Sequence, residues 1–120
     1  MSGVSYPVVH FEISGKNGRE LQEYYANLFG WKINADNPMN YGLVPAGEGG
    51  IGGGICDGPG SVVIYVAVPD LQAALDKAVA LGGKVIHPIE HIPGMVTFAM
   101  IEDPQGNVMG MVLDDPNMKG

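Results

Sequence analysis

The chain has 120 residues, of which 46% are apolar and 16% are charged, and its net charge is −7. This length suits one compact domain, here residues 1–120, and the composition argues against intrinsic disorder. The few Lys and Arg residues form no cluster. Nucleic acid is therefore not an expected partner, because binding it depends on positive side chains that neutralise its phosphates.

The single cysteine, Cys56, excludes an internal disulfide and any zinc site made of paired cysteines. The first residues show no basic region followed by an apolar stretch, and no apolar run approaches the roughly 20 residues of a membrane span. We therefore expect a cytoplasmic protein with no membrane partner.

The first half of the chain begins with a predicted strand over residues 8–14. Period-2 alternation places Val8, His10 and Glu12 on one face, and an apolar set on the other face that should lie beneath a helix. Apolar residues at helical spacing over 21–29 predict that helix, with Asn17 as its N-cap and Gly30 as its end. Further strands are expected at residues 31–35, 39–46 and 51–56.

The pattern restarts after the turn residues 57–60. A β-branched strand is predicted over 61–68, and Pro69-Asp70 initiates a helix with an apolar stripe that ends at Gly82. The remaining predicted elements are a strand at 84–87, a loop at 88–94, a strand at 95–101 and a strand at 107–113. The tail from residue 114 onward should fray.

Asp103-Pro104-Gln105-Gly106 predicts a type I turn that joins the last two strands as a hairpin. The two halves also repeat one order of elements, and their helix ends correspond closely, with Leu28 to Ile33 matching Ala80 to Val85. The repeat and the turn together resemble the vicinal oxygen chelate superfamily, which contains glyoxalase I, bleomycin-resistance proteins and extradiol dioxygenases.

The resemblance implies an α+β fold of two tandem βαβββ modules, at residues 7–56 and 61–113, whose mixed sheet curls around a pocket. It also implies a homodimer. In metal-using members, ligands come from the first and last strands of each module. His10 matches the first such place. Val63 takes the equivalent place in the second module, or Val62 if the loops align without a gap. Glycines of the run 52–54 take the last-strand place of the first module, and Gly110 stands where a glutamate ligand is expected.

Only one of four family ligand places is therefore kept, and we expect no metal or other cofactor. A divalent metal held by other residues is the alternative. Glu12 lies beside His10 on the same strand face, but two ligands hold an ion weakly. His87 and His91 flank Pro88 in a predicted strand and loop, and offer no helical i, i+4 pair.

His10 and Glu12 have two interpretations. One is structural, a partly buried histidine hydrogen-bonded to Glu12 or to backbone. The other is functional: the pair orients a ligand or transfers protons, since a neighbouring carboxylate raises the pKa of an imidazole. They are the candidate catalytic residues if the protein is an enzyme.

The pocket lining predicted from strand alternation is mostly apolar, which is usual for small-molecule sites. The candidate ligand-binding residues are His10, Glu12, Tyr41, Gly53, Val63, Tyr65, Val108 and Gly110. Trp31 is a further candidate, although core packing is the simpler interpretation. Met109, Met111 and Leu113 take the opposite face and should pack under a helix.

Two local features carry no chemistry in this interpretation. The glycine-rich stretch 47–54 lacks the Lys-Ser or Lys-Thr of a phosphate loop and no helix follows it. Cys56 has no basic neighbour in sequence that would activate it as a nucleophile.

These features favour a metal-independent protein of glyoxalase/bleomycin-resistance type that binds a small apolar or aromatic molecule in the pocket between the modules. The alternatives are a lyase-like or isomerase-type enzyme acting on a small oxygenated metabolite, with or without a divalent metal, and an accessory module with a vestigial pocket. The enzyme alternative rests on fold analogy alone.

Overall fold

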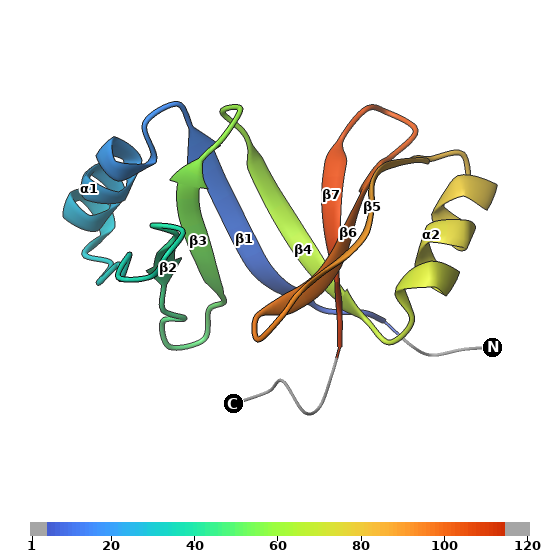
Figure 1. The fold of residues 1–120 in the computed structure, drawn as a ribbon, viewed down its shortest axis with the longest axis horizontal. Coiled ribbons are helices and arrows are strands. Elements are labelled where there is room, and N and C mark those ends of the chain that lie inside the picture. The colour runs from blue at the N-terminus through green and yellow to red at the C-terminus, as the bar shows by residue number, and fades with distance from the viewer. Residues whose placement is uncertain (1–4, 115–120) are drawn as a thin grey trace. The chain divides into compact units, whose positions relative to one another are not determined.

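A computed structural model describes residues 5–114 of the chain, and the expectations for the extreme N-terminus and for the tail after residue 114 lie outside these residues. The fold is α+β, with two helices and seven strands in mixed parallel and antiparallel pairing (Figure 1). The chain divides into two compact units. One, the N-terminal unit, is Val9–Ile64, and the other, the C-terminal unit, is Tyr65–Gly120 together with Met1–Val8.

The N-terminal unit contains the first repeat: β1 (Val8–Gly15), α1 (Gly18–Phe29), β2 (Gly42–Val44) and β3 (Gly52–Asp57). β3 pairs in parallel with β1 and antiparallel with β2. The helix begins where the Asn17 side chain accepts the Glu20 N–H and ends at Gly30, whose φ of 73° is a left-handed conformation. Both predicted helix ends are confirmed.

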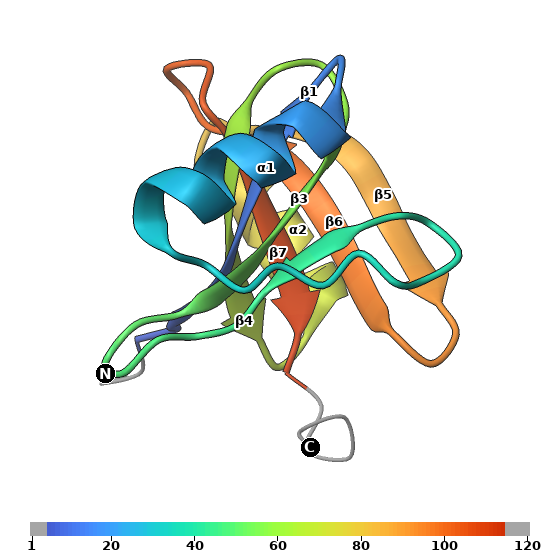
Figure 2. The same ribbon diagram turned by 90° about the vertical axis from the view of Figure 1, so that its left-hand side faces the viewer.

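α1 lies against β3 (Figure 2). The Gln22 side chain extends from the helix and donates to the carbonyl oxygen of Ile55 at 2.8 Å. An aromatic cluster joins helix and sheet, because the Trp31 ring lies 5.6 Å from the Phe11 ring and 5.0 Å from the Phe29 ring. Trp31 therefore packs on the helix side of the sheet, as the simpler interpretation expected.

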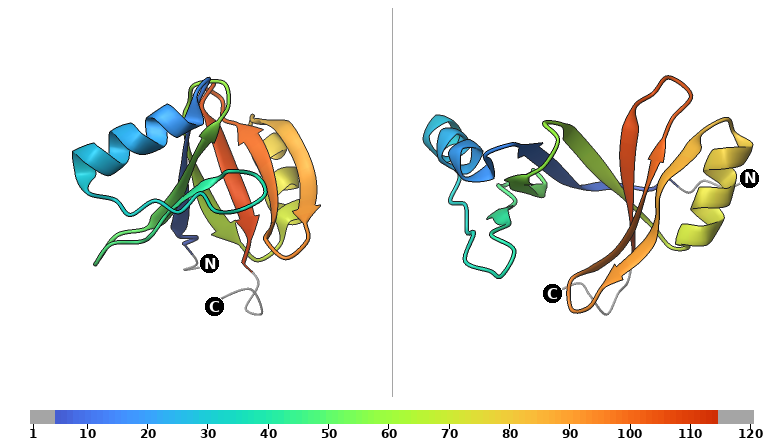
Figure 3. Two further views of the ribbon diagram at one scale, coloured as in Figure 1. Left: turned by 60° about the vertical axis from the view of Figure 1, so that its left-hand side comes forward. Right: turned by 45° about the horizontal axis from the view of Figure 1, so that its top comes forward.

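The C-terminal unit contains the second repeat. It consists of β4 (Val62–Val68), which crosses the boundary between the units, α2 (Leu71–Ala80), β5 (Lys84–Ile92), β6 (Val96–Glu102) and β7 (Val108–Leu113). Within this unit the strand order is β4-β7-β6-β5, with β4 and β7 parallel and the other pairs antiparallel. Figure 3 shows α2 lying against β5 and β6.

The hydrophobic core cluster lies between α2 and its sheet. Its buried members are Val68, Leu71, Leu75, Ala99 and Met111. Leu113 packs against this cluster, so Met111 and Leu113 lie under a helix as predicted. The predicted turn at the β6–β7 hairpin is also confirmed, since the Gly106 N–H donates to the Asp103 carbonyl oxygen at 3.0 Å.

The turn is further held by the Asp103 carboxylate, which accepts the backbone N–H groups of Gln105 and Asn107. These hydrogen bonds, first those from Asn107, lower the pKa of Asp103.

Three predicted strand boundaries are wrong. The strand expected at residues 31–35 is only a bridge between Asn34 and Leu43. The strand expected at 39–46 is confined to Gly42–Val44, because the Asn37 side chain bonds both the N–H and the carbonyl of Tyr41 and closes a turn. β5 continues through the predicted loop at 88–94 as far as Ile92, and shifts in its register accommodate Pro88, which cannot donate to the ladder.

Candidate functional site

The candidate site in the N-terminal unit is built on β1, where His10 and Glu12 share one face. In the parallel register, His10 lies beside Gly52 and Glu12 beside Gly54 on β3. The two glycines present no side chains on this face, and Tyr41, just before β2, occupies the space above Gly54. A Cβ on Gly54 would overlap the Tyr41 ring, so glycine is required there by contact with tyrosine.

The Tyr41 hydroxyl joins the two ionisable side chains of β1. It donates to Glu12 Oε2 at 3.0 Å and lies 2.8 Å from His10 Nε2. Because its single proton is directed at Glu12, the hydroxyl oxygen must accept the second hydrogen bond, and Nε2 must carry a proton. The sequence predicted His10 and Glu12 side by side, and the structure places a tyrosine hydroxyl between them.

His10 is half-buried, and this burial lowers the pKa of its imidazole, while the nearby charge of Glu12 raises it and only partly offsets the effect. The carboxylate thus acts in the predicted direction, but burial outweighs it and the net pKa is lowered. The neutral ring, protonated on Nε2, is the form the site favours near neutral pH. The arrangement can donate and accept hydrogen bonds and can pass a proton between imidazole and carboxylate through a hydroxyl.

The same face continues to Cys56, which lies beside Ser14. Burial, with the charges of Glu12 and Asp57, raises the pKa of the Cys56 thiol to about 11. The thiol is thus protonated near neutral pH, which agrees with the prediction that it is no nucleophile.

The C-terminal unit repeats the glycine and tyrosine arrangement. Tyr65 on β4 lies beside Gly110 on β7, and a Cβ on Gly110 would overlap the Tyr65 ring. Tyr65 is 7% exposed. In both units, therefore, a tyrosine ring covers a glycine in the last strand of the repeat.

The other predicted site residues are placed differently. Gly53 lies on the opposite face of β3 from Gly54, where a Cβ would lie 2.5 Å from the Phe11 ring, so the structure does not bring Gly53 to His10. Val63 is buried on β4, and Val108, at the start of β7 beside Glu102, is 37% exposed. His10, Glu12 and Tyr41 come together in one unit, and Tyr65 and Gly110 in the other.

The residues do not fit the family's metal ion. Between residues 5 and 114, no three His, Cys, Asp or Glu side chains gather as a set that could hold a metal ion. The Tyr65 ring fills the space beside Gly110, where the resemblance implies a glutamate ligand, and the Tyr41 ring fills the space beside Gly54. In the same range, no helix is long and apolar enough to cross a membrane.

Comparison with known proteins agrees with this fold. A glyoxalase-like domain model matches residues 10–112. "Putative glyoxylase CFP32" of Mycobacterium bovis is 34% identical over 85 residues, which cover 65% of this chain and 31% of the relative, and the Mycobacterium tuberculosis protein of that name matches equally. The chain thus spans about a third of the length of these relatives.

Two solved structures have a similar fold at low sequence identity. A glyoxalase/bleomycin resistance protein/dioxygenase superfamily member from Vibrio splendidus has a TM-score of 0.63 and 14% identity, covering 92% of this chain and 100% of that one. Methylmalonyl-CoA epimerase from Mycobacterium tuberculosis has a TM-score of 0.65 and 16% identity, covering 92% and 89%. The chain belongs to the glyoxalase-like domain family of the vicinal oxygen chelate superfamily.

Proposed function

We propose that this chain binds a small apolar or aromatic molecule without a metal ion, and that His10, Glu12 and Tyr41 are its polar contacts. The observation that carries the proposal is the tyrosine over glycine in each repeat: Tyr41 on Gly54 and Tyr65 on Gly110. A tyrosine ring, in place of a metal-binding side chain, supplies apolar area and one hydroxyl. This suits an organic molecule better than a cation.

The polar part of this site has a defined protonation pattern. The Tyr41 hydroxyl is committed to Glu12 as donor and to His10 as acceptor. A ligand that hydrogen-bonds here meets a carboxylate and a largely neutral imidazole held in one geometry. Such a few fixed polar groups on an apolar surface determine ligand orientation.

The first test is native mass spectrometry of freshly purified protein, before and after incubation with Zn²⁺, Ni²⁺ or Mg²⁺. We expect no stoichiometric metal, and a retained organic mass would identify the ligand. One tightly bound metal ion per chain would contradict the proposal.

The second test uses Tyr41→Phe, which keeps the ring over Gly54 and removes only the hydroxyl. We expect any retained or titrated ligand to bind about tenfold more weakly, the effect of one lost hydrogen bond. Tyr24→Phe is the matched control, because Tyr24 is 57% exposed on α1. Unchanged binding by Tyr41→Phe and by His10→Gln would exclude this face as the site.

The second candidate function is a lyase or isomerase acting on a small oxygenated metabolite, with or without a divalent metal. The hydrogen-bonded series His10–Tyr41–Glu12 favours it, because it joins a base to a carboxylate through a proton-carrying hydroxyl. One similar structure is that of an epimerase. Incorporation of solvent deuterium next to the carbonyl of small 2-oxo and 2-hydroxy compounds would support this function, provided that His10→Gln abolishes it.

We also propose that the chain forms a homodimer. Leu28 and Phe29 on α1 are each 55% exposed, and apolar side chains of this size are commonly buried at subunit interfaces. Light scattering of the eluting protein should give twice the chain mass of 12.6 kDa. A monomer at micromolar concentration would contradict this proposal.

A further inference from the structure

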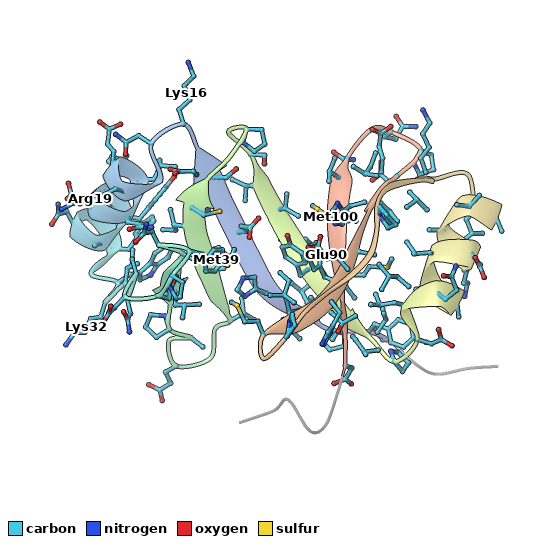
Figure 4. All side chains as sticks on the ribbon, in the orientation of Figure 1. Lys16, Arg19, Lys32, Met39, Glu90 and Met100 are labelled. Atoms are coloured by element: carbon cyan, nitrogen blue, oxygen red, sulfur yellow. The ribbon has the colours of Figure 1, made fainter. Side chains whose placement is uncertain are left out.

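The C-terminal unit has a second sheet face, opposite its hydrophobic core, that carries its own polar pair. Residues directly opposite each other in a sheet share a face, so the register defines rows across the four strands. One row is Tyr65, Gly110, Met100 and His87, and the next is Ala67, Val112, Phe98 and Glu90. Figure 4 shows the labelled side chains of Met100 and Glu90 on the side of β6 away from α2.

His87 and Glu90 reach this face together because β5 is irregular. In a regular strand, residues three apart point to opposite faces. Here the register shifts between His87, opposite Met100, and Glu90, opposite Phe98, so β5 contains one residue more than β6 over this interval. Such a bulge redirects side chains and is often found beside functional sites. Sequence reasoning missed the pair, although Pro88 within an apolar strand was a signal for a bulge.

The His87 imidazole is fixed from two directions. Its Nε2 lies 2.7 Å from Glu90 Oε1, so Nε2 carries the proton that the carboxylate accepts. Its ring stacks on Phe98, with centroids 5.1 Å apart and an interplanar angle of 4°. Within residues 5–114 no side chain or backbone group hydrogen-bonds to its Nδ1. The side chains of His87 and Glu90 are 41% and 51% exposed, so a ligand can reach them.

We infer that His87 and Glu90 form a second binding site, which takes a small planar molecule with an acidic O–H or N–H group, such as a phenol or an enol. The ligand donates this hydrogen to His87 Nδ1 and lies against the apolar surface of Phe98 and Met100. If the proton moves fully, the ligand keeps the electron pair as an oxyanion or nitrogen anion, and the imidazolium charge lies 2.7 Å from the Glu90 carboxylate. His87 and Glu90 are not among the polar contacts of the proposed function, although the row of His87 includes Tyr65 and Gly110.

The His87–Glu90 pair differs from an ordinary surface ion pair because the Glu90 carboxylate fixes the orientation of the His87 ring. Exposed ion pairs contribute little to stability and need no particular ring orientation. His91 provides the comparison within the same strand. Its Nδ1 is 2.6 Å from the Thr97 hydroxyl, and by register it lies on the other face. Among residues 5–114, neither a carboxylate nor an aromatic ring contacts the His91 ring.

The test titrates full-length protein with 4-nitrophenol, whose phenolate absorbance reports its ionisation, while NMR follows the ring nitrogens of the three histidines. We expect saturable binding with a shift of the His87 Nδ1 resonance. His87→Gln should weaken binding about tenfold or more, and Glu90→Gln several-fold, because the ring loses its orienting acceptor.

Two controls separate this site from other effects. His91→Gln should bind the probe as the wild type does, and so should Tyr24→Phe, whose ring is 57% exposed on α1. Absence of binding, an unshifted His87 resonance, or equal affinity in His87→Gln would overturn the inference. Loss of binding in Tyr41→Phe alone would assign the probe to the N-terminal unit and would likewise overturn it.

Discussion

The two units are built from one repeat, yet the buried hydrophobic cluster found among residues 5–114 lies beneath the helix of the C-terminal unit. Leu71 and Leu75 on α2 are 4% and 5% exposed, whereas Leu28 and Phe29 on α1 are each 55% exposed. The difference begins in the last strand of each repeat. β7 presents Met111 and Leu113 to its helix, while β3 contains Gly52, Gly53 and Gly54 and offers α1 few side chains on which to pack. Helical apolar spacing alone does not determine burial, because the facing strand must supply the partners.

The sheet face turned away from the helix also differs between the two units. Each has a tyrosine over a glycine. In the N-terminal unit, Tyr41 also bridges an imidazole and a carboxylate of β1, which is separated from β2 by β3 in the sheet order. The glycines of β3 leave room for a ring on each face of the strand, Phe11 at Gly53 and Tyr41 at Gly54.

The largest expected effect comes from truncating a helix side chain in each unit. Leu75→Ala removes a buried side chain and should lower the free energy of unfolding by about 2–5 kcal/mol. Leu28→Ala should lower it by less than Leu75→Ala does, because within the chain the Leu28 side chain is 55% exposed. Urea denaturation measures both, and equal losses would show that the cores do not differ as described.

A smaller effect is expected from adding a methyl group beneath each tyrosine. Gly54→Ala should cost about 1–3 kcal/mol, because the Tyr41 ring has to move. In a Tyr41→Ala background the same change should cost much less, since the overlapping ring is gone. A double-mutant cycle with no coupling would contradict the contact. Gly110→Ala with Tyr65→Ala is the parallel cycle in the C-terminal unit.

The N-cap side chains of the two helices allow a third comparison, in which removing one cap should cost about 1 kcal/mol of the free energy of unfolding. Asp70 accepts the Ala73 N–H and Asn17 accepts the Glu20 N–H, each at 3.0 Å. Asp70→Ala should lower the free energy of unfolding by about 1 kcal/mol. Asn17→Ala should do so by less if α1 can open while the rest stays folded, and hydrogen exchange of α1 amides would detect that opening. Equal losses in both assays would indicate one cooperative unit.

The smallest expected effect is the pH dependence due to His10. In the folded protein the pKa of His10 lies below its ordinary value of 6.5. Well above pH 6.5 the ring is therefore neutral in both the folded and the unfolded chain, and His10 adds no pH dependence to the free energy of unfolding. As the pH falls below 6.5, the unfolded chain binds the proton first, and the folded state loses stability until its own pKa is passed.

Wild-type protein should therefore lose more stability than His10→Gln between pH 7.5 and pH 5.5, measured by denaturant titration at both values. The opposite sign would show that Glu12, not burial, dominates the environment of His10.

Much of the fold was predictable because its signals are local. The N-cap at Asn17, the left-handed Gly30, the Asp103–Gly106 turn and the apolar stripe of α2 each follow from a few neighbouring residues. Strand ends were less predictable. Asn37 closes a turn by bonding Tyr41, and β5 passes through Pro88, and neither interaction follows from hydrophobic alternation.

The site was predictable only in part. Alternation places His10 and Glu12 on one face of β1, but the hydroxyl between them comes from Tyr41, about thirty residues away, and depends on how β2 and β3 pair. Gly53 was predicted to line the site, but it lies on the other face of β3. A one-residue shift in register exchanges the two faces of a strand, so a small error in alignment is enough to cause this. The His87–Glu90 pair needed a bulge that residue spacing does not determine.

The irregularity of β5 has one further consequence, for behaviour at high protein concentration. β5 is the outermost strand of its sheet, and unpaired outer strands can add strands from other molecules and grow into fibrils. The two register shifts, the missing N–H of Pro88 and the charges of Lys84 and Glu90 interrupt such growth. The bulge that brings His87 to Glu90 thus also protects this edge against aggregation.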